Sequence, residues 1–143
     1  MIKIEPLLLF NGQCEQAIEL YTKAFGAKLI YLGRYGKANP QDVEKETGIP
    51  FDKVDKSLVY HAQIKIGRQV LLMADDIRGG EYGQRGNVHL VASLDTAEAV
   101  EAAYAALSDG ATIVDPLHKT AYCSCCGTLV DKFGMYWDIM AAK

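Results

Sequence analysis

Two stretches of the chain carry apolar residues at the spacing of a surface helix. Within Gln13–Phe25 and within Thr96–Ser108, apolar positions recur at i, i+3, i+4 and i+7, which places them on one side of a helix. Gly26 and Gly110 follow these stretches, and glycine favours the left-handed conformation found just past a helix end. The pattern therefore predicts two amphipathic helices, each packed on the rest of the protein by one side.

Polar or small residues ahead of both helices are candidate caps. Asn11 or Gly12 is expected to cap the first helix, because both residue types are favoured at that position. Asp95 followed by Glu98 resembles a capping box, in which two side chains bond free backbone N–H groups at the helix start.

Short runs of strand-type residues follow each predicted helix. These runs are Lys28–Tyr35, Val59–Ile66 and Gln69–Asp75 in the first half, and Thr112–Asp115, Tyr122–Val130 and Met135–Met140 in the second. The polar stretch Gly36–Ser57 separates the first run from the second, and we expect a long loop there with one short helix near Asp42–Glu46. With an apolar strand ahead of each helix, both halves have the order strand, helix and three further strands.

An internal repeat supports this organisation. Phe10–Gly26 has the same pattern as Leu94–Gly110, at a constant shift of 84 residues. We therefore predict an α+β fold of two βαβββ modules, which form one curved mixed sheet with a cavity between them and the helices outside. In this single domain, module 1 spans about 1–78, a glycine-rich linker spans 79–87, and module 2 spans about 88–143.

Composition narrows the class of protein. The 143 residues are 50% hydrophobic and 23% charged, as in one globular domain. No apolar run approaches the ~20 residues of a membrane span, and the first residues do not have the pattern of a signal peptide. The net charge of −3 is spread without a basic patch, so neither a nucleic acid nor a membrane is an expected partner. We expect a cytoplasmic protein with reduced cysteines.

Three segments carry a family resemblance. LLLFNGQCEQAIELYTKAFGAKL, HAQIKIGRQVLLMADD and AYCSCCGTLVDKFGMYWDIM together span much of the chain. They resemble the PhnB-like branch of the vicinal oxygen chelate superfamily, which includes glyoxalase I, extradiol dioxygenases and the fosfomycin and bleomycin resistance proteins. The resemblance implies the same two-module fold. Members of this superfamily divide between metalloenzymes and metal-free binding proteins.

The resemblance also implies candidate metal ligands, because the metalloenzymes place one ligand on each of four strands. In the first half these positions fall on Pro6 and Leu72, which have no donor side chain. In the second half they fall on His89 and Asp138, whose imidazole and carboxylate suit zinc, iron, nickel or manganese. The internal repeat aligns Glu5 rather than Pro6 with His89, which makes Glu5 a candidate third ligand.

Asp138 has a second interpretation. It lies within an apolar final strand, where a lone charge is costly unless it is paired. Arg34, Arg68 and His89 are the candidate partners. We expect either a shared ion at ~2.0–2.2 Å from His89 and Asp138, or a direct hydrogen bond of ~2.7–2.9 Å between them without an ion.

Three more residues are candidates for contact with a ligand. Tyr136 shares a face of the final strand with Asp138. Tyr122 opens the preceding strand, and His61 lies near the start of a strand in the first half.

The cysteines of the second half form a dense cluster. Cys123, Cys125 and Cys126 stand where the PhnB-like branch usually has aromatic, small and glycine residues. On a regular strand, Cys123 and Cys125 would share one face while Cys126 would take the other. We interpret them as small residues buried in a sheet, with a soft-metal site or a redox-sensitive thiol as the alternatives.

The expected function is that of a small-molecule-binding protein of the glyoxalase/bleomycin-resistance type with an incomplete metal site and no cofactor. The alternative is a divalent-metal-dependent lyase, isomerase or dioxygenase that uses His89 and Asp138. A third hypothesis is a protein whose main role is assembly. The expected partners are a small organic molecule and, as in relatives of this superfamily, a second copy of the chain.

Overall fold

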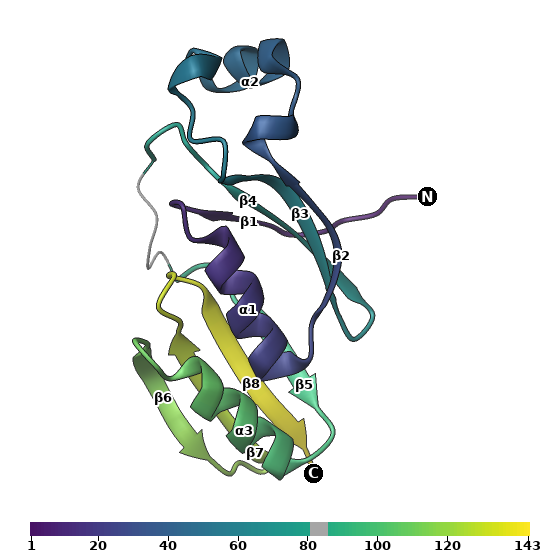
Figure 1. Cartoon of the computed structure of the whole chain (residues 1–143). Coiled ribbons are helices and arrows are strands. Elements are labelled where there is room, and N and C mark those ends of the chain that lie inside the picture. Colours follow the sequence, from purple (N-terminus) through teal and green to yellow (C-terminus); the bar gives the residue numbers. More distant parts are fainter. Residues whose placement is uncertain (81–85) are drawn as a thin grey trace. The chain divides into compact units, whose positions relative to one another are not determined.

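The computed structural model describes residues 1–80 and 86–143 and contains two four-stranded mixed sheets (Figure 1). The first unit contains β1 (Leu7–Phe10), α1 (Cys14–Phe25), β2 (Lys28–Arg34), α2 (Pro40–Thr47), β3 (Val59–Ile66) and β4 (Gln69–Asp75). The second contains β5 (Leu90–Leu94), α3 (Ala97–Leu107), β6 (Thr112–His118), β7 (Cys123–Val130) and β8 (Tyr136–Ala142). The predicted βαβββ order is therefore confirmed in both halves.

The two sheets have the same topology. The first has the order β1-β4-β3-β2 and the second β5-β8-β7-β6, with one parallel pair each, β1 with β4 and β5 with β8. No ladder joins them in the described parts of the chain, so the strands form two four-stranded mixed sheets, where the sequence predicted one curved mixed sheet. Each strand finds its partners inside its own module. The predicted linker 79–87 includes residues 81–85, which lie outside the described residues.

The second module shows why its residues form these elements. α3 packs against β8, β7 and β5 (Figure 1), and it buries Val100, Ala103, Tyr104 and Leu107. On β8 the side chains alternate, so that Trp137, Ile139 and Ala141 are buried. The residues between them, Tyr136, Asp138 and Met140, point to the other side, the face that α3 leaves uncovered. This side of the second sheet is called the open face below.

The predicted helices are confirmed, but both predicted caps are wrong. The side chain of Gln13, the N-cap residue of α1, makes no capping hydrogen bond, and the backbone N–H of Cys14 instead donates to Asp75 Oδ1 at 2.9 Å. α3 is capped by Thr96, whose Oγ1 accepts from the N–H of Ala99 at 3.1 Å. A carboxylate from β4 thus replaces a local cap in α1, and the cap of α3 lies one residue after the predicted Asp95.

Both sheets contain β-bulges, each of which inserts an unpaired residue into the ladder. The extra residue is Ile30 in β2, Tyr60 in β3, Val114 in β6 and Ser124 in β7, and β6 has a second irregularity between Asp115 and His118. The bulge in β7 corrects the predicted arrangement of the cysteines. Cys123 pairs with Ala142 and Cys126 with Met140, so these two cysteines share the open face while Cys125 lies on the other.

The segment between β2 and β3 is more ordered than the predicted loop. α2 is longer than the short helix expected there, because Asn39 caps it and Pro40 occupies its first turn. Two short 3₁₀ helices, Tyr35–Lys37 and Phe51–Lys53, flank it. Tyr35, Val43 and Val54 form a small buried core in this segment. None of the helices in 1–80 and 86–143 is long and apolar enough to cross a membrane.

Candidate functional site

The structure brings His89 and Asp138 together on the second sheet. β5 runs parallel to β8 with Val91 opposite Asp138, and His89 stands one residue before β5. His89 Nδ1 lies 2.7 Å from Asp138 Oδ2. The exposed fractions of the two side chains are 32% and 33%. This is the direct contact that the sequence analysis gave as one of two arrangements, and His89 is therefore the partner of Asp138 among the three that were considered.

Neighbouring groups hold both members of the pair. Thr128 lies opposite Asp138 on β7, and its hydroxyl donates to Asp138 Oδ1. His89 Nε2 lies 3.0 Å from the carbonyl oxygen of Gly86, which can only accept a hydrogen bond. The Tyr136 ring stacks on the His89 ring, with centroids 4.7 Å apart and an angle of 24° between the planes. Both oxygens of the carboxylate and both nitrogens of the imidazole thus have protein partners.

The remaining predicted site residues belong to other segments of the chain and have other surroundings. Glu5 forms an ion pair with Lys3 at 3.3 Å. Tyr122 precedes β7 and is 84% exposed. His61 lies on β3 in the first module, with its Nε2 3.3 Å from the side-chain nitrogen of Gln63. Within the described ranges, no three His, Cys, Asp or Glu side chains are grouped so that they could hold a metal ion.

His61 contributes to a hollow of about 210 Å³ in the first module. In its wall, the Tyr60 hydroxyl donates to Glu46 Oε1 at 2.8 Å, and this contact is the main cause that raises the pKa of Tyr60 to about 12. Arg78 forms a two-point ion pair with Asp76, with distances of 2.9 Å. The polar groups of this wall are therefore largely engaged with one another.

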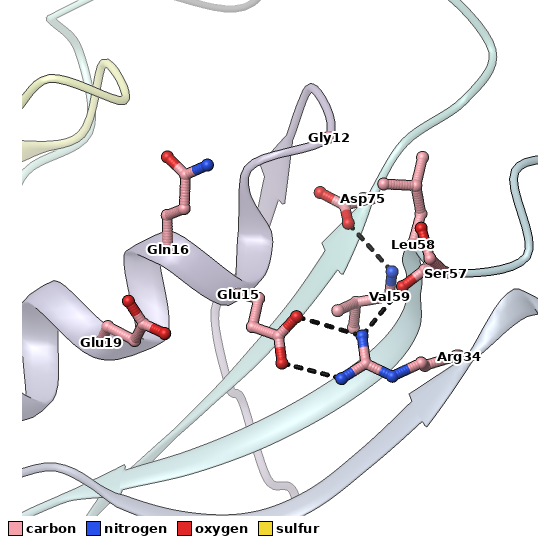
Figure 2. Close-up of a pocket in the computed structure, with 9 residues that line it drawn as sticks. All are labelled: Gly12, Glu15, Gln16, Glu19, Arg34, Ser57, Leu58, Val59 and Asp75. Carbon is pink, nitrogen blue, oxygen red and sulfur yellow. Dashed lines mark hydrogen bonds and ion pairs between the residues drawn. The ribbon is translucent and has the colours of Figure 1, made fainter.

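A larger hollow of about 370 Å³ lies beside the first half of α1 (Figure 2). Arg34 from the end of β2 donates to both carboxylate oxygens of Glu15, at 3.1 and 2.8 Å, and to the carbonyl oxygen of Ser57 at 2.8 Å. The Arg34 guanidinium holds the pKa of Glu15 below its usual range. Arg34, a candidate partner of Asp138 in the sequence analysis, thus pairs with Glu15.

Asp75 forms part of the wall of this hollow (Figure 2). Its side chain is buried, with only 1% of the residue exposed. One carboxylate oxygen accepts from Cys14 N and the other from Val59 N, both at 2.9 Å. The Asp75 carboxylate therefore fixes the start of α1 against the start of β3. Both of its oxygens stabilise the fold through these bonds.

Sequence reasoning did not find Thr128. Counting outward from the predicted turn Asp131–Gly134 would place Thr128 opposite Trp137, whereas in the structure Val130 pairs with Tyr136, which brings Thr128 opposite Asp138. The Glu15–Arg34 pair has no signal in the sequence either, because 19 residues separate the two side chains.

Comparisons with known proteins agree with the fold. YjdN from Escherichia coli K12 is 25% identical to this chain over 141 residues, which are 98% of this chain and 95% of that protein. A PhnB protein from Bacillus cereus, described as a putative 3-demethylubiquinone-9 3-methyltransferase, has a similar structure. Its TM-score is 0.81 at 22% identity, covering 99% of this chain and 100% of that one. For PA1353 from Pseudomonas aeruginosa the values are 0.80 and 24%, covering 99% and 98%.

The two structures share the fold of this chain. The family model for Glyoxalase/Bleomycin resistance protein/Dioxygenase matches residues 3–139, nearly the whole chain. The chain belongs to the Glyoxalase/Bleomycin resistance protein/Dioxygenase superfamily.

Proposed function

We propose that this protein binds a small organic molecule on the open face of the second sheet, at His89, Asp138 and Tyr136. The observation that carries the proposal is the His89–Asp138 pair, whose side chains are about two-thirds buried yet still reach the surface. Because the two side chains already hold each other in place, a ligand can bond to them without the cost of ordering them first.

The surroundings of the pair indicate what kind of ligand would fit. The stacked rings of Tyr136 and His89 present a flat surface, which favours a planar or apolar group. Each oxygen of the Asp138 carboxylate has a further lone pair that can accept from a ligand beside that surface, while both nitrogens of the His89 imidazole are already engaged. The ligand class is therefore a small, partly aromatic or apolar molecule that carries a hydrogen-bonding group.

Metal-dependent catalysis is the second candidate function. It is favoured by one observation, an imidazole nitrogen and a carboxylate oxygen that meet from neighbouring positions on β5 and β8. Two donors fit a divalent ion, which would act as a Lewis acid. The equivalent positions in the first module, Pro6 and Leu72, offer no donor side chain. We therefore place the binding function first.

Asp138→Asn is expected to weaken the binding of such ligands about tenfold or more, because a hydrogen bond to a charged group is worth roughly 1.5–3 kcal/mol. We would titrate ¹⁵N-labelled protein with small aromatic acids, phenols and amides and follow the backbone signals of β5 and β8. Asp115→Asn is the matched control, because it breaks another His–Asp contact in the same module, at 2.8 Å. Ligands that bind equally well to Asp138→Asn would contradict the proposal.

Calorimetric titration with Zn²⁺, Mn²⁺ and Ni²⁺ separates the two candidate functions. The protein should be purified without a metal-affinity tag. Binding of a small molecule in the absence of metal uptake supports the first candidate. Stoichiometric uptake of one ion that disappears in Asp138→Asn would support the second, because it would assign the carboxylate to the metal.

We also propose that the chain forms a homodimer. Apolar residues are about half exposed on the outer strands, with Leu29, Ile30 and Tyr31 on β2 and Ile113 and Val114 on β6. Outer strands with such side chains are usually covered by another part of the protein or by a second chain. Sedimentation at micromolar concentration is expected to show a dimer whose interface buries more than ~1,200 Å² in total. A monomer at that concentration would refute this proposal.

A further inference from the structure

Cys126 differs from the other cysteines of the chain in its surroundings. Cys14, Cys123 and Cys125 are buried, whereas Cys126 is partly exposed on the open face. Its Sγ lies 3.8 Å from Nε2 of His118, which stands directly opposite on β6. Cys123 lies on the same face and is among the groups that raise the pKa of Cys126.

The bulge at Ser124 brings Cys123 and Cys126 to the same face of β7. On a regular strand, residues three apart point to opposite faces. Here Cys123 and Cys126 pair with Ala142 and Met140, which are only two residues apart on β8. Two steps along a strand are about 6.4–6.8 Å, and disulfides usually join Cα atoms 4.4–6.8 Å apart. The two cysteines therefore stand at the upper limit of the separation that a disulfide can bridge.

We propose that Cys126 and Cys123 form a redox-active dithiol, which low-molecular-weight disulfides such as glutathione disulfide convert into an intramolecular disulfide. Cys126 is the attacking thiol because it is the one that a soluble reagent can reach. Cys123 is the resolving thiol because it is buried beside Cys126 on the same face.

The reaction takes place in two exchange steps. Cys126 loses its proton and attacks one sulfur of the reagent, so a mixed disulfide forms and one thiol of the reagent is released. Cys123 then loses its proton and attacks Cys126 Sγ, which releases the second reagent thiol. In total the protein loses two protons and two electrons, and the reagent disulfide is reduced to two thiols.

Local electrostatics indicate a slow reaction with a persistent product. Burial raises the pKa of Cys126, and the neighbouring Cys123 and Asp115 raise it further. The thiolate is therefore scarce at neutral pH, which slows the attack. The same environment does not stabilise the reduced thiolate, so it does not favour reduction of the disulfide once formed. Cys14 serves as a contrast, since complete burial raises its pKa to about 12 and removes it from reaction.

The test is to incubate the fully reduced protein with oxidised glutathione, block the remaining thiols and map the products by peptide mass spectrometry. In the wild type we expect a Cys123–Cys126 disulfide and two free thiols. Cys123→Ser should stop at glutathione on Cys126, and Cys126→Ser should show neither product. Cys125→Ser is the matched control, because its thiol lies on the other face of β7, and it should behave as the wild type.

Three results would overturn the proposal. The first is a wild-type protein that keeps four thiols in conditions that fully oxidise dithiothreitol. The second is glutathione attached first to Cys14 or Cys125. The third is equal oxidation of Cys126→Ser, provided that circular dichroism shows the variant folded. None of these readouts depends on a ligand at His89 and Asp138.

Discussion

Asp75→Asn is expected to lower the free energy of unfolding by about 2–4 kcal/mol. The substitution removes a hydrogen bond to a charged carboxylate, and it leaves one buried backbone N–H group without an acceptor. The Asp75 carboxylate accepts from Cys14 N and from Val59 N, one through each oxygen. An asparagine amide has one oxygen, so its NH₂ group must face one of these two donors. The start of α1 or the start of β3 then loses its partner.

Urea unfolding followed by circular dichroism measures this loss. Asp55→Asn is a suitable control, because Asp55 also accepts two hydrogen bonds, from the backbone N–H and the hydroxyl of Ser57, but does so at the surface. Water can replace those bonds, so the control should change stability much less than Asp75→Asn. Equal losses in the two variants would show that the buried carboxylate has no special role.

Asp131→Asn is expected to destabilise the second module by a similar amount, about 2–4 kcal/mol. Asp131 is 3% exposed and organises the turn between β7 and β8. Its Oδ1 accepts from the N–H groups of Phe133 and Met135, at 2.9 and 3.0 Å, and its Oδ2 accepts from Trp137 Nε1 at 3.0 Å. In the variant, the amide oxygen can keep the bonds from Phe133 N and Met135 N. The NH₂ group of the amide then faces the indole N–H of Trp137, and two donors oppose each other.

A double-mutant cycle with Trp137→Phe identifies the source of that loss. Phenylalanine removes the indole donor, so Asp131→Asn should cost less in the Trp137→Phe background than in the wild type. Circular dichroism serves for all four proteins, because the only tryptophan of the chain is changed in two of them. An identical cost in both backgrounds would exclude the indole bond as the cause.

Periodicity predicts most of the fold, because the apolar positions alone define which side of each element is buried. It fails where a distant group replaces a local one. The cap of α1 comes from Asp75, 61 residues away, and no rule that considers only Asn11 and Gly12 can find it. β6 was expected to end at Asp115, because Pro116 has no N–H to donate. It continues to His118, since β6 is an outer strand, where proline is tolerated.

Some residues of the candidate site could likewise be predicted from the sequence, and others could not. His89 and Asp138 follow from the family resemblance, and the alternation along the final strand places Tyr136 beside Asp138. Thr128 could not be added from the predicted turn Asp131–Gly134, because the paired strands are separated by one residue more than that turn contains. The arrangement of Cys123 and Cys126 could not be predicted either, because it depends on the bulge at Ser124, and a one-residue insertion leaves no mark in the pattern of small residues.

The bulges in β2 and β6 also bear on aggregation. Ile30 and Val114 occupy equivalent positions in the two modules, each in the strand that borders its sheet. Both strands are apolar and exposed, which is the composition that recruits foreign strands into fibrils. A bulge leaves one residue of the border unpaired and bends it, so an incoming flat strand cannot match its hydrogen bonds in continuous register. The duplicated bulge thus protects the β2 border of the first sheet and the β6 border of the second against fibrillar growth, while the apolar side chains of these strands stay available for contact.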